Sequence, residues 1–130
     1  MSYRDVELIL MRQLASTLAT AVFLVDPAGN LIFYNESAEL LLGQRFEETG
    51  AMPVEQWSTM FQPLDARGRV MAPESLPLVI SLQEKRPAYK AFWIRGLDGS
   101  KHRIRAAAFP LIGQRKTLVG AVAIFTEAPV

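Results

Sequence analysis

The sequence predicts a single α+β domain in which a long N-terminal helix precedes an antiparallel sheet. Residues 3–20 contain neither Pro nor Gly, so an uninterrupted helix can form there. Residues 21–35 hold two apolar stretches around a turn with Pro and Gly, and residues 88–127 hold three more apolar stretches. A chain of 130 residues has room for one core of this kind.

The composition excludes several classes of protein. The chain has no Cys, which excludes a disulfide framework, a thiolate metal site and a cysteine nucleophile. A single histidine, His102, excludes a multi-histidine metal site. No apolar run approaches the roughly 20 residues that cross a bilayer, and Asp5 and Glu7 interrupt the N-terminus before a signal peptide could form. We therefore predict a cytoplasmic protein without a membrane partner.

The charges are unevenly distributed although the net charge is only +1. Residues 1–65 hold 3 basic and 9 acidic side chains (3 − 9 = −6), and residues 66–130 hold 11 and 4 (11 − 4 = +7). One interpretation is an anionic partner such as nucleic acid. The interpretation we favour is a solvated sheet edge balanced by the acidic half, so we expect no nucleic-acid partner.

The N-terminal helix carries more apolar surface than one neighbour requires. Ser2 can cap it, and its apolar arc is wide because four further apolar residues flank a central stripe. The stripe consists of Leu8, Met11, Ala15 and Leu18. We predict that this stripe forms the interface of a homodimer. The alternative is a helix buried entirely within its own fold.

Two predicted strands, 21–26 and 31–35, form the clearest hairpin signal in the chain. The spacing then changes to helical over 35–43, where Asn35 is the expected N-cap and Gly43 the expected C-terminal stop.

Short helical turns and packed loops are predicted over 44–72, and a helix over 73–86 that Pro87 ends. Three strands should follow as an antiparallel meander, at 88–96, 101–112 and 116–127. The last strand is apolar on both faces, which predicts cover on both sides of the sheet. The helical region would cover one side, and the N-terminal helix or a second subunit the other.

Several short motifs occur in the same order and at similar spacing as in a known family. They are Asp26-Pro27-Ala28-Gly29-Asn30, Tyr34-Asn35, Leu64-Asp65-Ala66-Arg67-Gly68, Leu97-Asp98-Gly99-Ser100 and Gly120 followed by Ile124-Phe125-Thr126-Glu127. With this element order, the chain resembles a PAS sensory domain of the bacterial signalling type. The resemblance implies a five-stranded antiparallel sheet of order 2-1-5-4-3, with helices on one face and an N-terminal flanking helix. It divides the chain into a flanking helix (1–20), the domain (21–127) and an end (128–130) that would lead to an effector.

The resemblance also implies a function in signal transduction. We expect a sensor that binds a small apolar molecule, such as a fatty acid, and signals through dimer packing to a kinase, a phosphatase or a transcription regulator. The alternative is a ligand-free scaffold for protein interaction. The last strand ends in Thr126-Glu127 where many members have Thr-Asp, so the mode of output stays open.

Strand alternation and helix spacing indicate which residues would line a ligand cavity. They are Leu42, Met52, Trp57, Met60, Phe61, Leu78, Leu82, Phe92, Ile94, Ala106 and Ala108, with Leu24, Val79 and Val122 as further candidates. Adaptable Met side chains and the small alanines favour a gap that a guest fills. The alternative is a core that these side chains fill completely.

Flavin and haem are disfavoured as cofactors. A flavin photosensor of this family needs a reactive cysteine, and its haem sensors take a histidine from the helix before the third strand, but 73–86 has none. No nucleophile elbow, phosphate loop or carboxylate pair is present, so we predict that the chain is not an enzyme.

Overall fold

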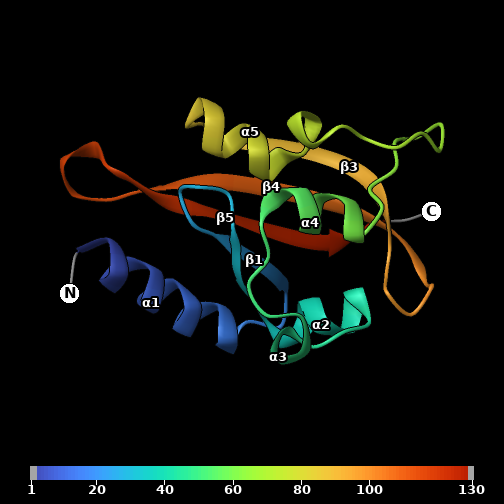
Figure 1. Cartoon of the computed structure of the whole chain (residues 1–130), viewed down its shortest axis with the longest axis horizontal. Coiled ribbons are helices and arrows are strands. Elements are labelled where there is room, and N and C mark those ends of the chain that lie inside the picture. The colour runs from blue at the N-terminus through green and yellow to red at the C-terminus, as the bar shows by residue number, and fades with distance from the viewer. Residues whose placement is uncertain (1–2, 129–130) are drawn as a thin grey trace.

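The computed structural model describes residues 3–128 and shows one sheet with helices on both sides (Figure 1). The helices are α1 (Tyr3–Thr17), α2 (Glu36–Leu42), α3 (Phe46–Thr49), α4 (Val54–Met60) and α5 (Pro77–Glu84), with short 3-10 turns η1 (Pro73–Ser75) and η2 (Gln114–Lys116). The strands are β1 (Ala21–Val25), β2 (Leu31–Tyr34), β3 (Ala88–Arg95), β4 (Lys101–Ile112) and β5 (Leu118–Glu127).

The sheet has the order β2-β1-β5-β4-β3, and every neighbouring pair is antiparallel. This confirms the predicted order 2-1-5-4-3 and the meander of the last three strands. In Figure 1, α1 lies on one side of the sheet and α5 on the other.

Several predicted boundaries differ by a few residues, and the helix predicted over 73–86 is divided into η1 and α5 at Leu76, whose backbone is extended. The first helix ends at Thr17, not at residue 20, because Leu18 N bonds to Ala15 O three residues back, and Asn35 Nδ2 donates to the same carbonyl at 2.9 Å. The last strand begins at Leu118, not at residue 116, because Lys116 has a φ of 59° and belongs to the preceding turn.

Asn35 joins three elements at the start of the sheet. It is buried, and its Oδ1 accepts from Val22 N at 3.0 Å and from Ala38 N at 3.1 Å, the latter being the predicted N-cap bond of α2. Its Nδ2 donates to Ala15 O at 2.9 Å and to Thr20 O at 2.8 Å. The side chain therefore ties α1, β1 and α2 together, a role that the cap prediction captured only in part.

Gly120 permits close contact between the middle strands and α1. Its φ is +152°, and a Cβ there would lie 2.3 Å from Val25 O and 3.3 Å from Leu8 Cδ2. Any larger residue would push β5 away from β1 and from the helix.

Buried apolar residues form two clusters, one on each face of the sheet. The inner cluster includes Phe23 and Tyr34 with residues of α2, α4 and α5, and the outer cluster consists of Ala15, Val22, Leu24 and Val122. Leu24 and Val122 therefore face α1, and their prediction as cavity residues is wrong. Both strands are apolar on both faces, so alternation alone did not reveal which side faces inward.

Candidate functional site

An apolar cavity of about 50 Å³ lies between the inner face of the sheet and the helices that cover it. It is lined by Phe23, Leu41, Leu42, Trp57, Ser58, Phe61, Pro63, Leu76, Pro77, Leu78, Phe92, Ile94, Ile104, Ala106, Ala123 and Phe125. None of these lining residues carries a charge, so the space suits an uncharged and mainly apolar guest.

Seven of the eleven residues predicted to bind a ligand line this cavity. They are Leu42, Trp57, Phe61, Leu78, Phe92, Ile94 and Ala106. The other four do not line the cavity. Met52 and Ala108 are buried in the inner cluster, and Met60 and Leu82 are partly exposed and pack against that cluster. Met52 is held beside β2, where its backbone pairs with Leu31. Whether any of these residues binds a ligand remains a prediction.

The sequence did not single out the aromatic residues that the middle strands contribute. Phe23 pairs with Ala123 across β1 and β5 and stacks edge to face on Phe125, with ring centroids 5.0 Å apart. Phe61 also packs edge to face on Phe23, with ring centroids 6.0 Å apart. The signal that could have found Phe23 and Phe125 is the pairing of their two strands, which exposes both side chains to the same face.

Ser58 is the one polar side chain among the lining residues. It is 3% exposed, and its Oγ has no hydrogen-bond partner among the described residues. The indole N–H of the adjacent Trp57 already donates to Gly29 O at 2.9 Å.

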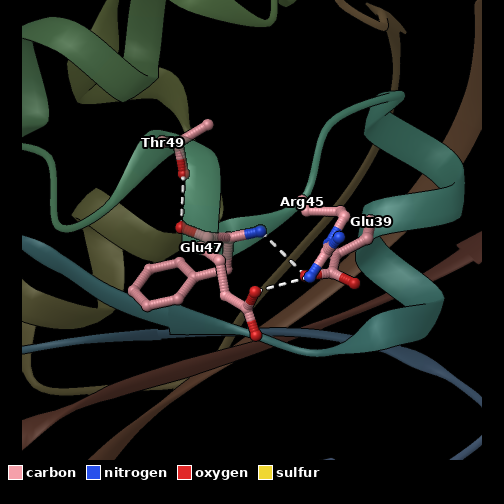
Figure 2. Close-up of polar contacts among 5 residues, drawn as sticks. Glu39, Arg45, Glu47 and Thr49 are labelled. Carbon is pink, nitrogen blue, oxygen red and sulfur yellow. Dashed lines mark hydrogen bonds and ion pairs between the residues drawn. The ribbon is translucent and has the colours of Figure 1, made fainter.

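Polar contacts join α2 to α3 (Figure 2) and form a polar corner there. Glu39 accepts a hydrogen bond from Phe46 N at 2.8 Å, and Thr49 Oγ1 meets the carbonyl of Phe46 at 3.3 Å. The Tyr34 hydroxyl reaches into this corner, at 3.1 Å from Thr49 Oγ1, and donates to Gln44 O at 3.0 Å. Burial raises the pKa of Tyr34 above its ordinary 10.0, although the Thr49 contact acts in the opposite direction.

The residues predicted to form a dimer interface lie mostly against the chain's own sheet. Ala15 is fully buried there, and Leu8 and Met11 pack on the same outer cluster. Leu18 is exposed, together with Val6, Ile9, Leu10 and Leu14. The described helix therefore leaves a different stripe open from the one predicted, because Leu8, Met11 and Ala15 supply the contact with its own domain.

His102 joins the start of β4 to the end of β5. Its Nε2 lies 2.9 Å from Ser100 Oγ and its Nδ1 3.2 Å from Glu127 Oε1, while Ser100 Oγ donates to Asp98 Oδ1 at 2.6 Å. Because the hydroxyl gives its single proton to Asp98, it does not act as a nucleophile activated by His102. The hydrogen bonds from Ser100 lower the pKa of Asp98. This chain of contacts anchors the C-terminal end of β5.

The comparisons with known proteins agree with this architecture. A family model described as a PAS domain matches residues 10–79, more than half of the chain, so the chain belongs to the PAS domain family. No curated protein matches the sequence significantly.

Similar solved structures share the fold at low sequence identity. A PAS domain from Colwellia psychrerythraea is 18% identical with a TM-score of 0.65, covering 94% of this chain and 97% of that one. A LOV protein from Rhodobacter sphaeroides is 13% identical with a TM-score of 0.73, covering 98% and 69%. A PAS domain from a two-component sensor histidine kinase is 12% identical with a TM-score of 0.60, covering 95% and 98%.

The cavity does not fit the large cofactors known in this family. Pockets for drug-sized ligands measure about 300–1,000 Å³, several times the 50 Å³ found here, and no histidine is among the lining residues. In residues 3–128, no group of three His, Cys, Asp or Glu side chains could hold a metal ion. No helix in that part of the chain is long and apolar enough to cross a membrane.

Proposed function

We propose that this PAS domain is a sensory module that reports the filling of its small apolar cavity through α1. The observation that carries the proposal is the position of β1 and β5, which separate the cavity from the helix. Phe23 and Phe125 line the cavity, whereas Val22, Leu24 and Val122 on the same two strands face α1.

Side chains along β1 and β5 alternate between the cavity face and the α1 face, so a change in the cavity can be transmitted to α1. A guest that displaces Phe125 or Ala123 also displaces their neighbours in β5, because interiors are packed too densely to absorb such a change locally. Val122 and Ile124 lie on the opposite face of that strand, in the cluster that holds α1. The shift would therefore reach the helix.

The output would be a change in association with a second copy or an effector. The exposed apolar side chains of α1, which include Leu10 at 59% and Leu14 at 53% exposure, offer a surface for a homodimer. Membership of the PAS family, and a fold shared with a PAS domain from a sensor histidine kinase, support a role in signal transduction. A kinase, a phosphatase or a transcription regulator remains the expected partner.

The test uses two alanines in neighbouring strands, one in the cavity and one exposed. Ala106→Val fills part of the cavity, and Ala91→Val is the matched control because Ala91 is exposed and pairs with the exposed Arg105. Amide hydrogen exchange along α1 should change about threefold or more in the first variant only. Equal exchange in both variants, with both folded, would overturn the proposed coupling.

The size of the cavity favours one second candidate, a ligand-free scaffold for protein interaction. A volume of 50 Å³ leaves no room for a fatty acid without rearrangement of the lining. Native and denaturing mass spectra of the purified protein separate the two. A mass excess that disappears on denaturation supports the sensor, and a bare mass combined with an unresponsive α1 supports the scaffold.

A further inference from the structure

Strand β3 forms one edge of the sheet, and its own chain covers only half of that edge. In the C-terminal half, the N–H of Trp93 donates to Leu64 O at 2.9 Å, and the Trp93 carbonyl accepts from Leu64 N at 2.8 Å. The N–H of Arg95 donates to Phe61 O at 2.9 Å. Leu64 therefore occupies the place of a further strand opposite Trp93, and the edge is closed there.

The N-terminal half of β3 is open. The pairing with β4 continues without a shift along all of β3, so the backbone groups of alternate residues point away from β4. Those of Trp93 point outward, so those of Tyr89 and Ala91 do as well. No described residue bonds to these groups, and both side chains are exposed. Tyr89 and Ala91 thus offer two donors and two acceptors to an added strand.

Two cations flank these free backbone groups, one on each face of the sheet by alternation. Lys90 lies between Tyr89 and Ala91 and is exposed. Arg105 in β4 pairs with Ala91, and these two residues line an open groove of about 380 Å³. No ion pair joins Lys90 or Arg105 to an acidic side chain in residues 3–128. An acidic partner would supply the missing opposite charges.

The same charges disfavour a second copy of this chain as the occupant. Antiparallel pairing of two identical edges through Tyr89 and Ala91 would place the two Lys90 residues directly opposite each other. The Cα atoms of such a pair lie about 4.5 Å apart, and like charges in direct opposition are destabilising. Lysine on an exposed edge protects against self-association. The edge therefore disfavours its own copies and favours a strand of opposite charge.

We propose that the open half of β3 binds an extended acidic segment of a partner protein, which adds to the sheet as an antiparallel strand. The antiparallel bridge between Leu64 and Trp93 already has this direction on the same edge. The surface includes neither the cavity nor α1, so the inference is independent of the proposed function.

The register of the edge specifies the motif that the segment carries. A side chain opposite Ala91 lies on the face of Arg105, about 9.5 Å or two strand spacings away, which Glu and Arg side chains bridge together. The next residue faces Lys90 directly, where a second acid is favoured. The third packs beside Tyr89, which favours a β-branched side chain. From N- to C-terminus, the motif is two acidic residues followed by Val or Ile.

The probe is a fluorescein-labelled peptide in which three threonines precede and three follow a central Glu-Glu-Val. The matched control peptide has Gln-Gln-Val in the same place. Binding is measured by fluorescence anisotropy, and amide hydrogen exchange of Tyr89 and Ala91 should slow when the acidic peptide binds. The control peptide should bind about fivefold more weakly or less tightly still, because it lacks both charges.

Two variants separate the charge from the added strand. Lys90→Glu should weaken binding of the acidic peptide about fivefold or more, because attraction becomes repulsion. Ala91→Pro removes one outward N–H without removing a bond to β4, and should weaken binding about tenfold. Arg67→Glu is the control, because it makes the same charge change at an exposed turn, and it should leave binding unchanged.

Equal peptide binding by wild type and Ala91→Pro, with both folded by circular dichroism, would overturn the added strand. If Ala91→Pro does not fold, Lys90→Glu decides, and equal binding there would overturn the proposal. No binding of the acidic peptide at millimolar concentration would also overturn it. So would an oligothymidylate that depends on Lys90 as strongly as the peptide does, because that result indicates a general anion site. A wild-type homodimer that Ala91→Pro dissociates would assign the edge to a second copy instead.

Discussion

The two faces of the sheet differ in how many buried apolar residues they carry. Among the described residues, the inner cluster contains 22 buried apolar residues drawn from the sheet and from the α2, α4 and α5 region, whereas the outer cluster contains four. The inner face holds the domain together and encloses the cavity. The outer face is covered by one helix, α1, which few buried side chains hold, a feature typical of elements that open at low free energy.

The attachment of α1 explains why the outer face is the easier one to displace. Ala15 is the helix's one fully buried contact among the described residues, and Leu8 and Met11 are only half-buried. Arg12 adds a cation–π contact, with its guanidinium carbon 4.6 Å from the centre of the Phe33 ring. The proposed function requires this division, in which a stable layer would bind and a weakly held layer would respond.

The largest effect should come from the residue that joins the two layers. Asn35→Ala removes four hydrogen bonds and leaves buried donors and acceptors without partners. The free energy of unfolding should fall by about 3 kcal/mol or more. Chemical denaturation followed by circular dichroism measures it.

Asn30→Ala is the control for this variant, because its amide makes a single side-chain contact with Asp26 in a half-buried turn. It should cost about 1 kcal/mol or less. A similar loss in both variants would show that Asn35 is not a junction of the two layers.

A pair of truncations measures the difference in packing directly. Ile104 and Leu24 are each 1% exposed, on the inner and outer faces respectively. Ile104→Ala should cost about 3–4 kcal/mol, because elements on several sides prevent the site from collapsing. Leu24→Ala should cost about 2 kcal/mol, because α1 can settle into the space. Equal losses in denaturant titrations would contradict the comparison.

The sequence predicted the strands and the helix caps better than it predicted which side chains line the cavity. The five strands, the N-cap at Asn35 and the stop at Gly43, which has a φ of 79°, all follow from local chemistry and are confirmed. The cavity depends on which face of β1 and β5 turns inward, and two strands that are apolar on both faces give no such signal. Phe23 was missed and Leu24 misplaced for this reason.

The apolar pattern of α1 was ambiguous in a similar way. Apolar residues surround most of α1, so spacing alone did not distinguish the stripe that contacts the sheet from the stripe that stays exposed. The close approach of Leu8 to Gly120 belongs to the stripe that contacts the sheet, and it involves a residue more than 100 positions away. The orphan hydroxyl of Ser58 likewise becomes visible only when the helices enclose it.

A smaller effect, confined to the inner layer, should appear at high pH. Burial raises the pKa of Tyr34 above its ordinary 10.0, so the folded state retains the phenol proton when the unfolded state has lost it. Stability from this source is fully present below pH 10 and is lost as the pH rises through the folded value. Tyr34→Phe should remove that dependence at a cost of about 1 kcal/mol near neutral pH.

Thermal unfolding between pH 8 and 11 checks this, with Tyr89→Phe as the control because Tyr89 is exposed on the edge strand β3. The same decline in stability for wild type and Tyr34→Phe would assign it to other groups.

The smallest effect on stability should come from the exposed stripe of α1. Leu10→Glu combined with Leu14→Glu should change the free energy of unfolding by about 0.5 kcal/mol or less, because both side chains already lie in solvent. The same change should abolish any homodimer, which sedimentation velocity over a concentration series would detect. Gln13→Glu controls for the added charge at an exposed position between them. A wild type that is a monomer at every concentration would contradict the homodimer and leave an effector as the proposed partner of α1.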